Sequence, residues 1–427
     1  MKGSNNRRAK SRRQKARTRP RVVELPRPAV TAGGRLRVVD FPPRLPPFSV
    51  ETFPLRVEEF SDVIALPLVA GTRKSKSALG AVYDRTGDLV VESQRSTRRF
   101  SWGDDEMHLD DLPYERSEAL PGRTLFAGRF VHHFGHILLE TLSRTWPDID
   151  YSVYDHLLLY PNRVLKRHIL PIPKVLQILL TAAEIPLDKV KVISRTPLRI
   201  EQLDVPSAPF RLASSADPRF LVPFDRIGLR VESRDGPDLT AQRPARVYLS
   251  RSHLADDKRR ATNEADLEEL MVRRGFTVVH PQEHPLEDQA AMIRRADVIA
   301  GCDGSALHLA VFAHPGAKLL AIDTRAVENQ FIIEQARELD AVHIWGATEK
   351  VPGRLAQWTA DLPRIAFALD LLLDEPLESE AVKREAQKRK TQKRKAQKRK
   401  AQKRTATSTR NLLAVSQLQA AWHRSAP

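Results

Sequence analysis

Short apolar runs alternate with stretches of helical periodicity between residues 246 and 323, and this alternation is the strongest constraint on the fold. The apolar runs predict buried strands at Val247–Ser250, Thr277–His280, Val298–Ala300 and Leu319–Asp323. The stretches between them predict helices: one capped by Asn263 and ended by Gly275, one at Leu286–Arg295 and one at Ser305–Ala313. Strand–helix alternation at this spacing is typical of a parallel, doubly wound sheet.

A less regular alternation comes before this region. Its predicted strands are Leu125–Ala127, His156–Tyr160 and Val190–Ser194, and its predicted helices are His136–Trp146 and Lys174–Ile185. Residues 78–93 predict two strands around an Asp-Arg-Thr-Gly turn. The stretch "SRDGPDLTAQRPA" at 233–245 predicts a linker. We therefore expect two α/β domains of the nucleotide-binding type, at 59–232 and 246–375, facing a cleft.

The net charge of +17 is concentrated at the two ends of the chain. Residues 1–21 contain 10 Lys and Arg, residues 383–404 contain 13 against one acid, and the remainder has 47 bases against 52 acids. The tail at 376–427 includes "AQKRKTQKRKAQKRKAQKR", whose five-residue period forms no apolar face, so we expect a disordered segment attracted to anionic lipid or nucleic acid. The segment at 1–58 is basic and then Pro-rich, and from residue 22 we expect extended chain.

Several classes of protein are disfavoured by composition. The single cysteine, Cys302, excludes an intrachain disulfide, so no oxidising compartment is required. No run of 18 apolar residues predicts a membrane span, and the basic N-terminal residues have no apolar core of the signal-peptide type. We expect a cytoplasmic protein, or one peripheral to the inner face of a membrane.

The loop "GCDGSALHLAVFAHPGAK" at 301–318 follows a predicted strand, where ligands of parallel sheets collect. Ser305 is a candidate N-cap, and the amides of residues 305–308 would then attract phosphate; the alternative is a turn glycine with a capping serine. Asp303 is either a base or sugar-hydroxyl ligand, or a loop aspartate bonded to nearby amides. His308 either reaches the cleft or is packed in the core. The loop matches neither the P-loop nor the dinucleotide-binding pattern.

A second cluster is "RFVHHFGHILLE" at 129–140, in which a continuous helix would align His133, His136 and Glu140 on one face. Three interpretations compete. One is a metal site, although the pattern is not His-Glu-x-x-His and no third ligand is identifiable. Another is a general base, His136, oriented by Glu140. The third is a histidine hydrogen-bonded within the fold.

A third cluster is basic. Arg251, in "YLSRS", directly follows a predicted strand and is a candidate for two phosphate oxygens, while Arg259 and Arg260 add positive charge near a helix start. A solvated basic loop is the alternative. The acidic stretch "DDEMHLDD" at 104–111 is interpreted as a surface loop rather than a cation site.

Together these motifs resemble glycosyltransferase family 61, whose bacterial members are often labelled capsular polysaccharide biosynthesis proteins. The resembling segments occur in the family's order: "HFGHILLETLSRTWP", "YLSRS", "RRATNE" and the run from "RRGFTVVHPQ" to "HPGAK". The resemblance is strongest over 245–323 and extends over 124–147. It implies a GT-B architecture, in which two Rossmann-like domains face a cleft and the C-terminal one binds a nucleotide-sugar.

The resemblance also implies an inverting sugar transfer that needs no metal or other cofactor, to a glycan or lipid-linked acceptor. By position, it assigns Arg251 to the donor phosphate and Gly304 and Ser305 to the neighbourhood of the nucleotide-sugar. We add His308 and Arg259 as further donor-binding candidates. It places His136 and Glu140 in an acceptor-side motif. We predict His136 as the base, Glu140 as its support and Asp303 as the reserve base.

Two alternatives to a transferase remain open. The first is a non-catalytic family member, because the loop departs from the commoner Gly-Pro-His-Gly-Ala-Gly-Leu-Thr-Asn form and carries Leu309 where Asn is expected. The second is a nucleic-acid-binding protein acting through its basic ends. We do not expect the second, because the remainder of the chain is acidic and contains no RNA-binding motif.

Overall fold

The computed structural model describes residues 22–25, 33–40, 47–67, 81–94, 114–161, 164–165, 168–169, 171–193, 195–234, 245–254, 260–325, 328–345, 348–350 and 357–374. The chain divides into two compact units, Met1–Leu372 and Leu373–Pro427, and nearly all of the second lies outside the described residues. The predictions for the basic repeat, for the acidic stretch 104–111 and for most of the linker 233–245 also fall outside them.

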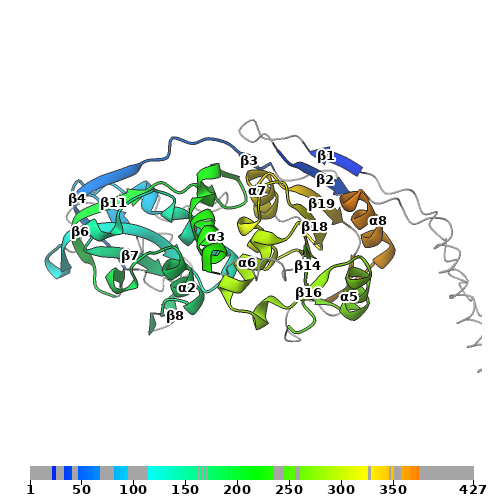
Figure 1. The fold of residues 1–427 in the computed structure, drawn as a ribbon. Helices are drawn as coiled ribbons and strands as arrows, with labels where there is room; N and C mark the ends of the chain where they lie inside the picture. The colour runs from blue at the N-terminus through cyan, green and yellow to red at the C-terminus, as the bar shows by residue number, and fades with distance from the viewer. Residues whose placement is uncertain are drawn as a thin grey trace, which may run out of the picture. The chain divides into compact units, whose positions relative to one another are not determined.

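Among the described residues, six strands form a first, mixed sheet in the order β10-β7-β6-β11-β4-β5 (Figure 1). Their bounds are β4 Val57–Ala65, β5 Val82–Tyr83, β6 Glu118–Phe130, β7 His156–Pro161, β10 Val190–Val192 and β11 Leu198–Pro206. The four strands from β10 to β11 are parallel, whereas β4 pairs antiparallel with β11 and β5. The long strand β6 ends beside the histidine cluster, so this sheet positions His133 and His136.

Seven described strands form a second sheet in the order β1-β2-β19-β18-β17-β14-β16. Their bounds are β1 Val22–Leu25, β2 Arg35–Val39, β14 Arg246–Leu249, β16 Thr277–Val279, β17 Val298–Cys302, β18 Lys318–Asp323 and β19 Asp340–Trp345. All neighbours pair in parallel except β1 and β2. The parallel sheet expected from the alternation is therefore confirmed.

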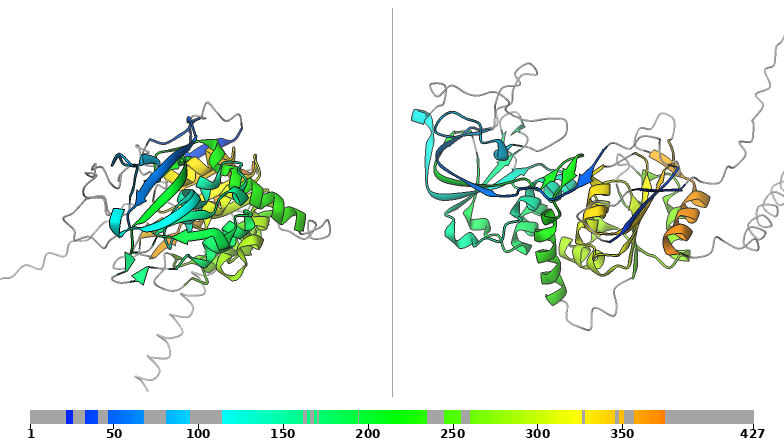
Figure 2. Two further views of the ribbon diagram at one scale, coloured as in Figure 1. Left: turned by 90° about the vertical axis from the view of Figure 1, so that its left-hand side faces the viewer. Right: turned by 90° about the horizontal axis from the view of Figure 1, so that it is seen from above.

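Helices flank the second sheet on both faces, α5 and α8 on one and α6 and α7 on the other (Figures 1 and 2). The 3₁₀ helix η10 packs against α6 and α7. Their bounds are α5 Glu264–Arg273, α6 Leu286–Arg295, the 3₁₀ helix η10 Leu307–Phe312, α7 Glu328–Ala336 and α8 Leu362–Leu373. In α6, Leu286, Ala290 and Ile293 recur at helical spacing and are buried. The acids of its first turn and the two arginines of its last turn complement the helix dipole, which explains why the predicted bounds are correct to the residue.

The two sheets are connected by helix packing rather than by sheet pairing. Helix α3 (Val222–Arg234) contacts α6, and its Asp225 carboxylate accepts hydrogen bonds from Arg294 of α6 (2.9 Å) and from Arg337, the residue after α7 (2.6 Å). One hydrophobic core includes buried side chains from α3, α6, α7 and helix α2 (Lys174–Ala182). This continuous core holds the ends of both sheets in a defined arrangement.

Shorter elements complete the described chain. The short strands are β3 Ser49–Val50, β8 Val164–Leu165, β9 His168–Ile169, β12 Phe210–Arg211, β13 Ser215–Ala216, β15 Arg260–Ala261, β20 Thr348–Lys350 and β21 Gln357–Ala360. The short helices are η1 Val91–Ser93, η3 Tyr114–Arg116, α1 Phe134–His136, the π-helical η4 Ile137–Thr141, η5 Leu142–Thr145, η6 Tyr151–Val153, η7 Leu187–Lys189, η8 Pro218–Leu221 and η9 Pro281–Glu283. Of these, α1 and η4 carry the histidine cluster.

The N-terminal segment differs from the sequence expectation. We expected extended chain between residues 22 and 58, separate from both domains. The backbone there is extended where it is described, but β2 pairs in parallel with β19 and buries Leu36, Val38 and Val39. The pairing of residues some 300 positions apart explains why local sequence did not reveal it. The domain boundaries themselves remain a prediction.

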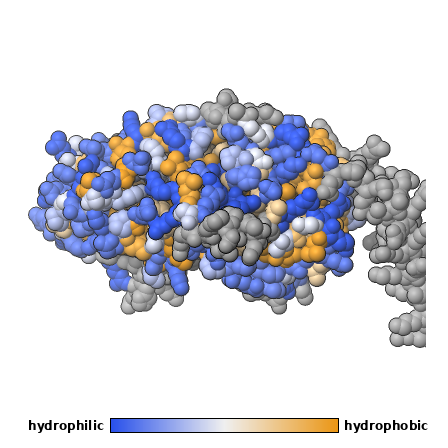
Figure 3. Space-filling model, in the orientation of Figure 1, coloured by the Kyte–Doolittle hydropathy of each residue, from blue (hydrophilic) through white to orange (hydrophobic). Residues whose placement is uncertain are grey.

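The surface seen in Figure 3 is mainly hydrophilic over the described residues, with apolar side chains scattered among polar ones. Such scattered apolar side chains are ordinary for a folded domain. Within the described part of the chain, we find no helix with the length and apolar character needed to cross a membrane.

Candidate functional site

The strand order of the second sheet defines where a ligand is expected. Numbered by their position in the chain, β16, β14, β17, β18 and β19 follow the order 2-1-3-4-5, so the winding reverses between β14 and β17. In open parallel sheets, ligands bind beyond the carboxyl ends of the strands at such a reversal. Arg251 follows β14 and Asp303 follows β17. The topology thus brings two predicted site residues to the same edge of the sheet.

Arg251 and Asp303 are in direct contact. The Arg251 guanidinium donates from Nη2 to the backbone oxygen of Asp303 at 2.7 Å, and the Arg251 backbone N–H donates to the Glu264 carboxylate at 3.2 Å. The Asp303 carboxylate accepts hydrogen bonds from Thr324 Oγ1 (2.7 Å) and Arg325 Nε (3.2 Å), and its side chain is 1% exposed. These bonds favour a role for Asp303 in holding the loop, although its role as reserve base remains a prediction.

The loop after β17 differs from the predicted phosphate cradle. Gly304 has φ +144°, a conformation that favours glycine, so this glycine is required by the turn. We expected Ser305 to cap an α-helix, but the residue before the helix is Ala306 and the helix is the 3₁₀ helix η10. The amides of Leu307 and His308 donate to Gly304 O (2.9 Å) and Ser305 O (3.2 Å) inside the turn. These two amides are therefore used by the fold.

The histidine cluster lies where the chain leaves β6. His133 is extended (φ −142°, ψ 118°) and precedes α1, which leads directly into the π-helical turn η4. His136 Nδ1 and Glu140 Oε2 are 2.6 Å apart, with side chains 32% and 8% exposed. Turns of π-helix are frequent at functional sites because they re-aim side chains within a helix. The expected pairing of His136 with Glu140 is confirmed as a contact.

The histidine cluster contacts the loop that follows β17. His133 Nε2 lies 3.4 Å from Ser305 Oγ, and the rings of His133 and His136 contact edge to face with centroids 4.9 Å apart. A Cβ atom added to Gly135 would lie 2.7 Å from Cδ2 of His308 and 3.5 Å from Ser305 Oγ. The absence of a side chain at Gly135 therefore allows the close approach of the two segments.

His308 is buried against this junction. Its side chain is hydrogen-bonded through Nδ1 to Gln330 Oε1 at 2.9 Å. Burial lowers the pKa of His308 to about 4, against a smaller opposing effect of the Gln330 hydrogen bond. The imidazole is therefore neutral near pH 7. The burial of the ring agrees with the packed interpretation of His308, and its role in donor binding remains a prediction.

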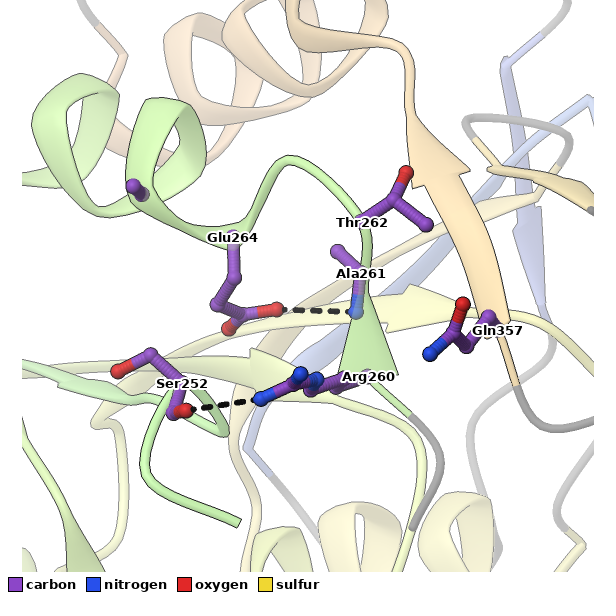
Figure 4. A pocket seen from close by; sticks show the side chains of 7 residues that line it. Ser252, Arg260, Ala261, Thr262, Glu264 and Gln357 are labelled. Carbon is purple, nitrogen blue, oxygen red and sulfur yellow. Dashed lines mark hydrogen bonds between the residues drawn. The ribbon is translucent and has the colours of Figure 1, made fainter. Parts of the chain in front are cut away.

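A hollow of about 350 Å³ opens beside the residue after Arg251 (Figure 4). It is lined by Ser252, Arg260, Ala261, Thr262, Glu264, Ala265 and Gln357. Arg260 donates to the backbone oxygens of Ser252 (3.3 Å) and Leu254 (3.4 Å), while Glu264 accepts from the Ala261 amide (3.2 Å). Arg259, a predicted donor-binding residue, lies outside the described residues, and its neighbour Arg260 is the arginine that lines the hollow.

No group of three or more His, Cys, Asp or Glu side chains that could hold a metal ion occurs among the described residues. The metal-site interpretation of His133, His136 and Glu140 accordingly finds no support there. The acidic stretch 104–111 lies outside the described ranges.

Sequence reasoning missed four buried polar residues near the site: Asp323, Gln330, Glu334 and His343. They form a continuous set of hydrogen bonds that reaches His308. A signal was present for two of them, because Asp323 ends the apolar strand "KLLAID" and His343 interrupts the apolar strand "DAVHIW". A polar residue in a buried strand requires a hydrogen-bonding partner, which is the inference that was available.

The mixed α/β fold and a site at the reversal of a parallel sheet are features of many nucleotide-dependent enzymes. Residues 134–320 match the model of the family Glycosyltransferase 61. The matched range contains both the His136–Glu140 pair and the Gly304–Ser305 turn, so it agrees with the family resemblance seen in the motifs. The match supports glycosyltransferase activity in general. No curated protein matches the chain.

Proposed function

We propose that this protein is an inverting, metal-independent glycosyltransferase of the GT-B type, acting in bacterial surface polysaccharide biosynthesis. It transfers a sugar from a nucleotide-sugar donor to a glycan or lipid-linked acceptor. The observation that carries the proposal is the meeting of the His133–Glu140 segment with the Gly304–His308 turn, next to Arg251. Residues 134–140 of the first segment and the whole of the second lie within the range 134–320 that matches the family.

The proposed base is His136. Its Nδ1–H donates to Glu140 at 2.6 Å, which orients the ring and leaves Nε2 as the basic nitrogen. The acceptor hydroxyl gives its proton to Nε2 as its oxygen bonds to the anomeric carbon of the sugar. The bond from that carbon to the diphosphate breaks on the opposite face, and the nucleoside diphosphate leaves. A base positioned in this way contributes about 10²–10⁴-fold to the rate.

The proposed electrostatic partner of the leaving diphosphate is Arg251. Its guanidinium is planar and always charged, which suits two phosphate oxygens, and its bond to Asp303 O fixes it at the sheet edge. Asp303 in turn is held by Thr324 and Arg325. The hollow lined by Ser252, Arg260 and Thr262 is the proposed position of the nucleoside, adjacent to Arg251.

A thermal-shift screen tests the function directly. Binding of a ligand to the folded state raises the apparent melting temperature by mass action. We expect a concentration-dependent rise with one class of nucleoside diphosphate and with its sugar derivatives, and a transfer assay with that donor then identifies product. If no nucleotide or nucleotide-sugar raises the melting temperature of the full chain, the proposal is wrong.

We also propose that the tail at 376–427 holds the enzyme on an anionic membrane, where lipid-linked acceptors are found. The support is its composition, since each basic residue near such a surface contributes roughly 1 kcal/mol. Sedimentation with phosphatidylglycerol vesicles should retain the full chain in the pellet at low salt. A variant in which the lysines and arginines of 383–404 are replaced by glutamine should stay in the supernatant. Equal partitioning of the two proteins would contradict the idea.

A further inference from the structure

A line of buried side chains runs from the site into the second sheet. His308 Nδ1 contacts Gln330 Oε1 (2.9 Å), and Gln330 Nε2 donates to Glu334 Oε1 (2.9 Å). Glu334 Oε2 contacts His343 Nε2 (2.6 Å), and His343 Nδ1 contacts Asp323 Oδ2 (2.6 Å). All five residues are at most 6% exposed. We call these five residues the buried relay.

The protonation of the buried relay is determined by His343, which lies between two carboxylates. His343 faces a carboxylate with each ring nitrogen, so both nitrogens must donate and the ring is an imidazolium. Burial alone lowers the pKa of His343, but the Glu334 and Asp323 carboxylates outweigh it and raise the pKa to about 10. Burial raises the pKa of Asp323 to about 6, which still leaves it ionised at pH 7.

The direction of every other hydrogen bond follows. The Glu334 carboxylate pairs with His343 and accepts from Gln330, so the amide nitrogen of Gln330 faces it and the amide oxygen faces His308. That oxygen can only accept, so His308 Nδ1 must carry a proton. Neutral His308 then has its lone pair on Nε2. The tautomer is thus determined by a charged histidine three hydrogen bonds away.

The Nε2 atom of His308 faces the junction of the two clusters. It lies 3.4 Å from the position that a Cβ of Gly135 would take, and Ser305 Oγ is 3.5 Å from that same position. None of the described residues forms a hydrogen bond with this nitrogen. The histidine belongs to the turn that continues from Asp303, the residue held by Arg251. A group attached to a diphosphate at Arg251 would therefore lie beside the turn that carries His308.

We infer that the buried relay locks His308 in the Nδ1–H tautomer so that Nε2 accepts a hydrogen bond from a hydroxyl of the donor sugar. The inference rests on the proposed function and names a specificity residue for it. Gln330 and Glu334 are positioning residues, because they act through His308. A site with a fixed acceptor discriminates against sugars that lack the matching hydroxyl, since its lone pair is then left without a donor.

Nitrogen NMR tests the tautomer without substrate. In protein labelled with ¹⁵N-histidine, His308 should give a protonated Nδ1 and an unprotonated Nε2 at pH 7, assigned by comparison with His308→Phe. Gln330→Leu removes the acceptor of the Nδ1–H hydrogen bond, so the His308 signals should shift toward those of the Nε2–H tautomer or average between the two tautomers. Gln335→Leu, in the same helix, should leave the signals unchanged. A protonated Nε2 in the wild-type protein would overturn the inference.

Calorimetry of ligand binding tests the contact with sugar. The probes are the uridine, guanosine and thymidine diphosphates and their hexose derivatives. His308→Phe and Gln330→Leu should each weaken binding of the sugar derivative by about tenfold or more, while affinity for the nucleoside diphosphate alone changes by less than about twofold. Equal losses for both ligands, or no loss for either, would overturn the inference. If the wild-type chain binds none of these probes, the proposed function is wrong, and the NMR measurement still decides the tautomer.

Discussion

His133 Nε2 lies 3.4 Å from Ser305 Oγ, although 172 residues separate them in the chain. One residue extends from the end of β6 in the first sheet and the other from the end of β17 in the second. This contact joins the segment proposed to activate the acceptor to the turn proposed to hold the donor. A transfer reaction requires these two substrates within bonding distance, because positioning supplies much of its rate.

The turnover number kcat should depend on His136, the histidine paired with Glu140, and not on an exposed histidine elsewhere. His136→Ala is expected to lower kcat by about 10²–10⁴-fold, with little change in thermal unfolding because the side chain is 32% exposed. Glu140→Gln should lower kcat less, since it keeps the shape but loses the charge that orients the ring. The control is His314→Gln, an exposed histidine on the loop before β18, which should retain full activity. Steady-state kinetics and differential scanning fluorimetry together distinguish lost chemistry from lost fold, and unchanged kcat in His136→Ala would exclude this base.

Nucleoside diphosphate affinity should depend on the arginine that follows the carboxyl end of β14 and not on the arginine at the amino end of that strand. Arg251→Ala removes the proposed diphosphate ligand and the bond to Asp303 O, so we expect nucleoside diphosphate affinity to fall by at least about tenfold. Arg246, at the start of the same strand, donates to Arg274 O at the opposite edge of the sheet. Arg246→Ala should leave affinity unchanged in the same titration. Similar affinities for both variants would show that the ligand binds elsewhere.

The imidazolium within the buried relay should make stability fall in alkaline solution. The pKa of His343 is raised to about 10 in the folded protein, so the native state holds a proton that the unfolded state loses above about pH 6.5. The stabilisation is therefore complete below about pH 6.5 and is lost as the pH rises toward 10, with a slope of up to about 1.4 kcal/mol per pH unit. Urea unfolding at a series of pH values measures the slope.

The matching variant is His343→Gln. It leaves Glu334 and Asp323 buried without their cation, so it should lower the unfolding free energy by about 3–5 kcal/mol at pH 7. It should also show a smaller decline between pH 6.5 and 10 than the wild type. Parallel profiles for the two proteins would mean that another group titrates.

Much of the second sheet was predictable because its signals are local. Apolar runs and helical periodicity identified β14, β16, β17 and β18 to within two residues. Helix α3 was not predicted beside the assumed linker, and β2 was not recognised as a strand. Its place in the sheet depends on pairing with β19, a contact between distant parts of the chain that no local pattern encodes.

The candidate site was predictable in its residue types but not in their orientations. Motif resemblance selected His136, Glu140 and Arg251, and the first two are in contact. By sequence, Asp303 fits both a base and a loop aspartate. Only the hydrogen bonds from Thr324 and Arg325 show that its carboxylate is bound within the fold. Ser305 likewise matches a helix cap by type, yet its hydroxyl lies near His133. Such choices depend on tertiary neighbours, which compete with local hydrogen-bonding preferences.

A single methyl group at Gly135 should separate the two clusters. Replacement of a glycine inside a helix by alanine ordinarily stabilises by roughly 0.5–1 kcal/mol, and Gly135 lies in α1 with no positive φ. Its Cβ would, however, lie 2.7 Å from Cδ2 of His308, whose ring is held in place by Gln330. Either His308 or α1 must move, so we expect Gly135→Ala to lower kcat/KM by at least about tenfold and to give no gain in melting temperature. The control is Gly228→Ala in α3, where the nearest atoms, of the Arg294 side chain, are 3.4 Å away, an ordinary van der Waals distance. That variant should be as active as the wild type and at least as stable, and if Gly135→Ala behaved in the same way, the close approach of the two segments would not be required for catalysis.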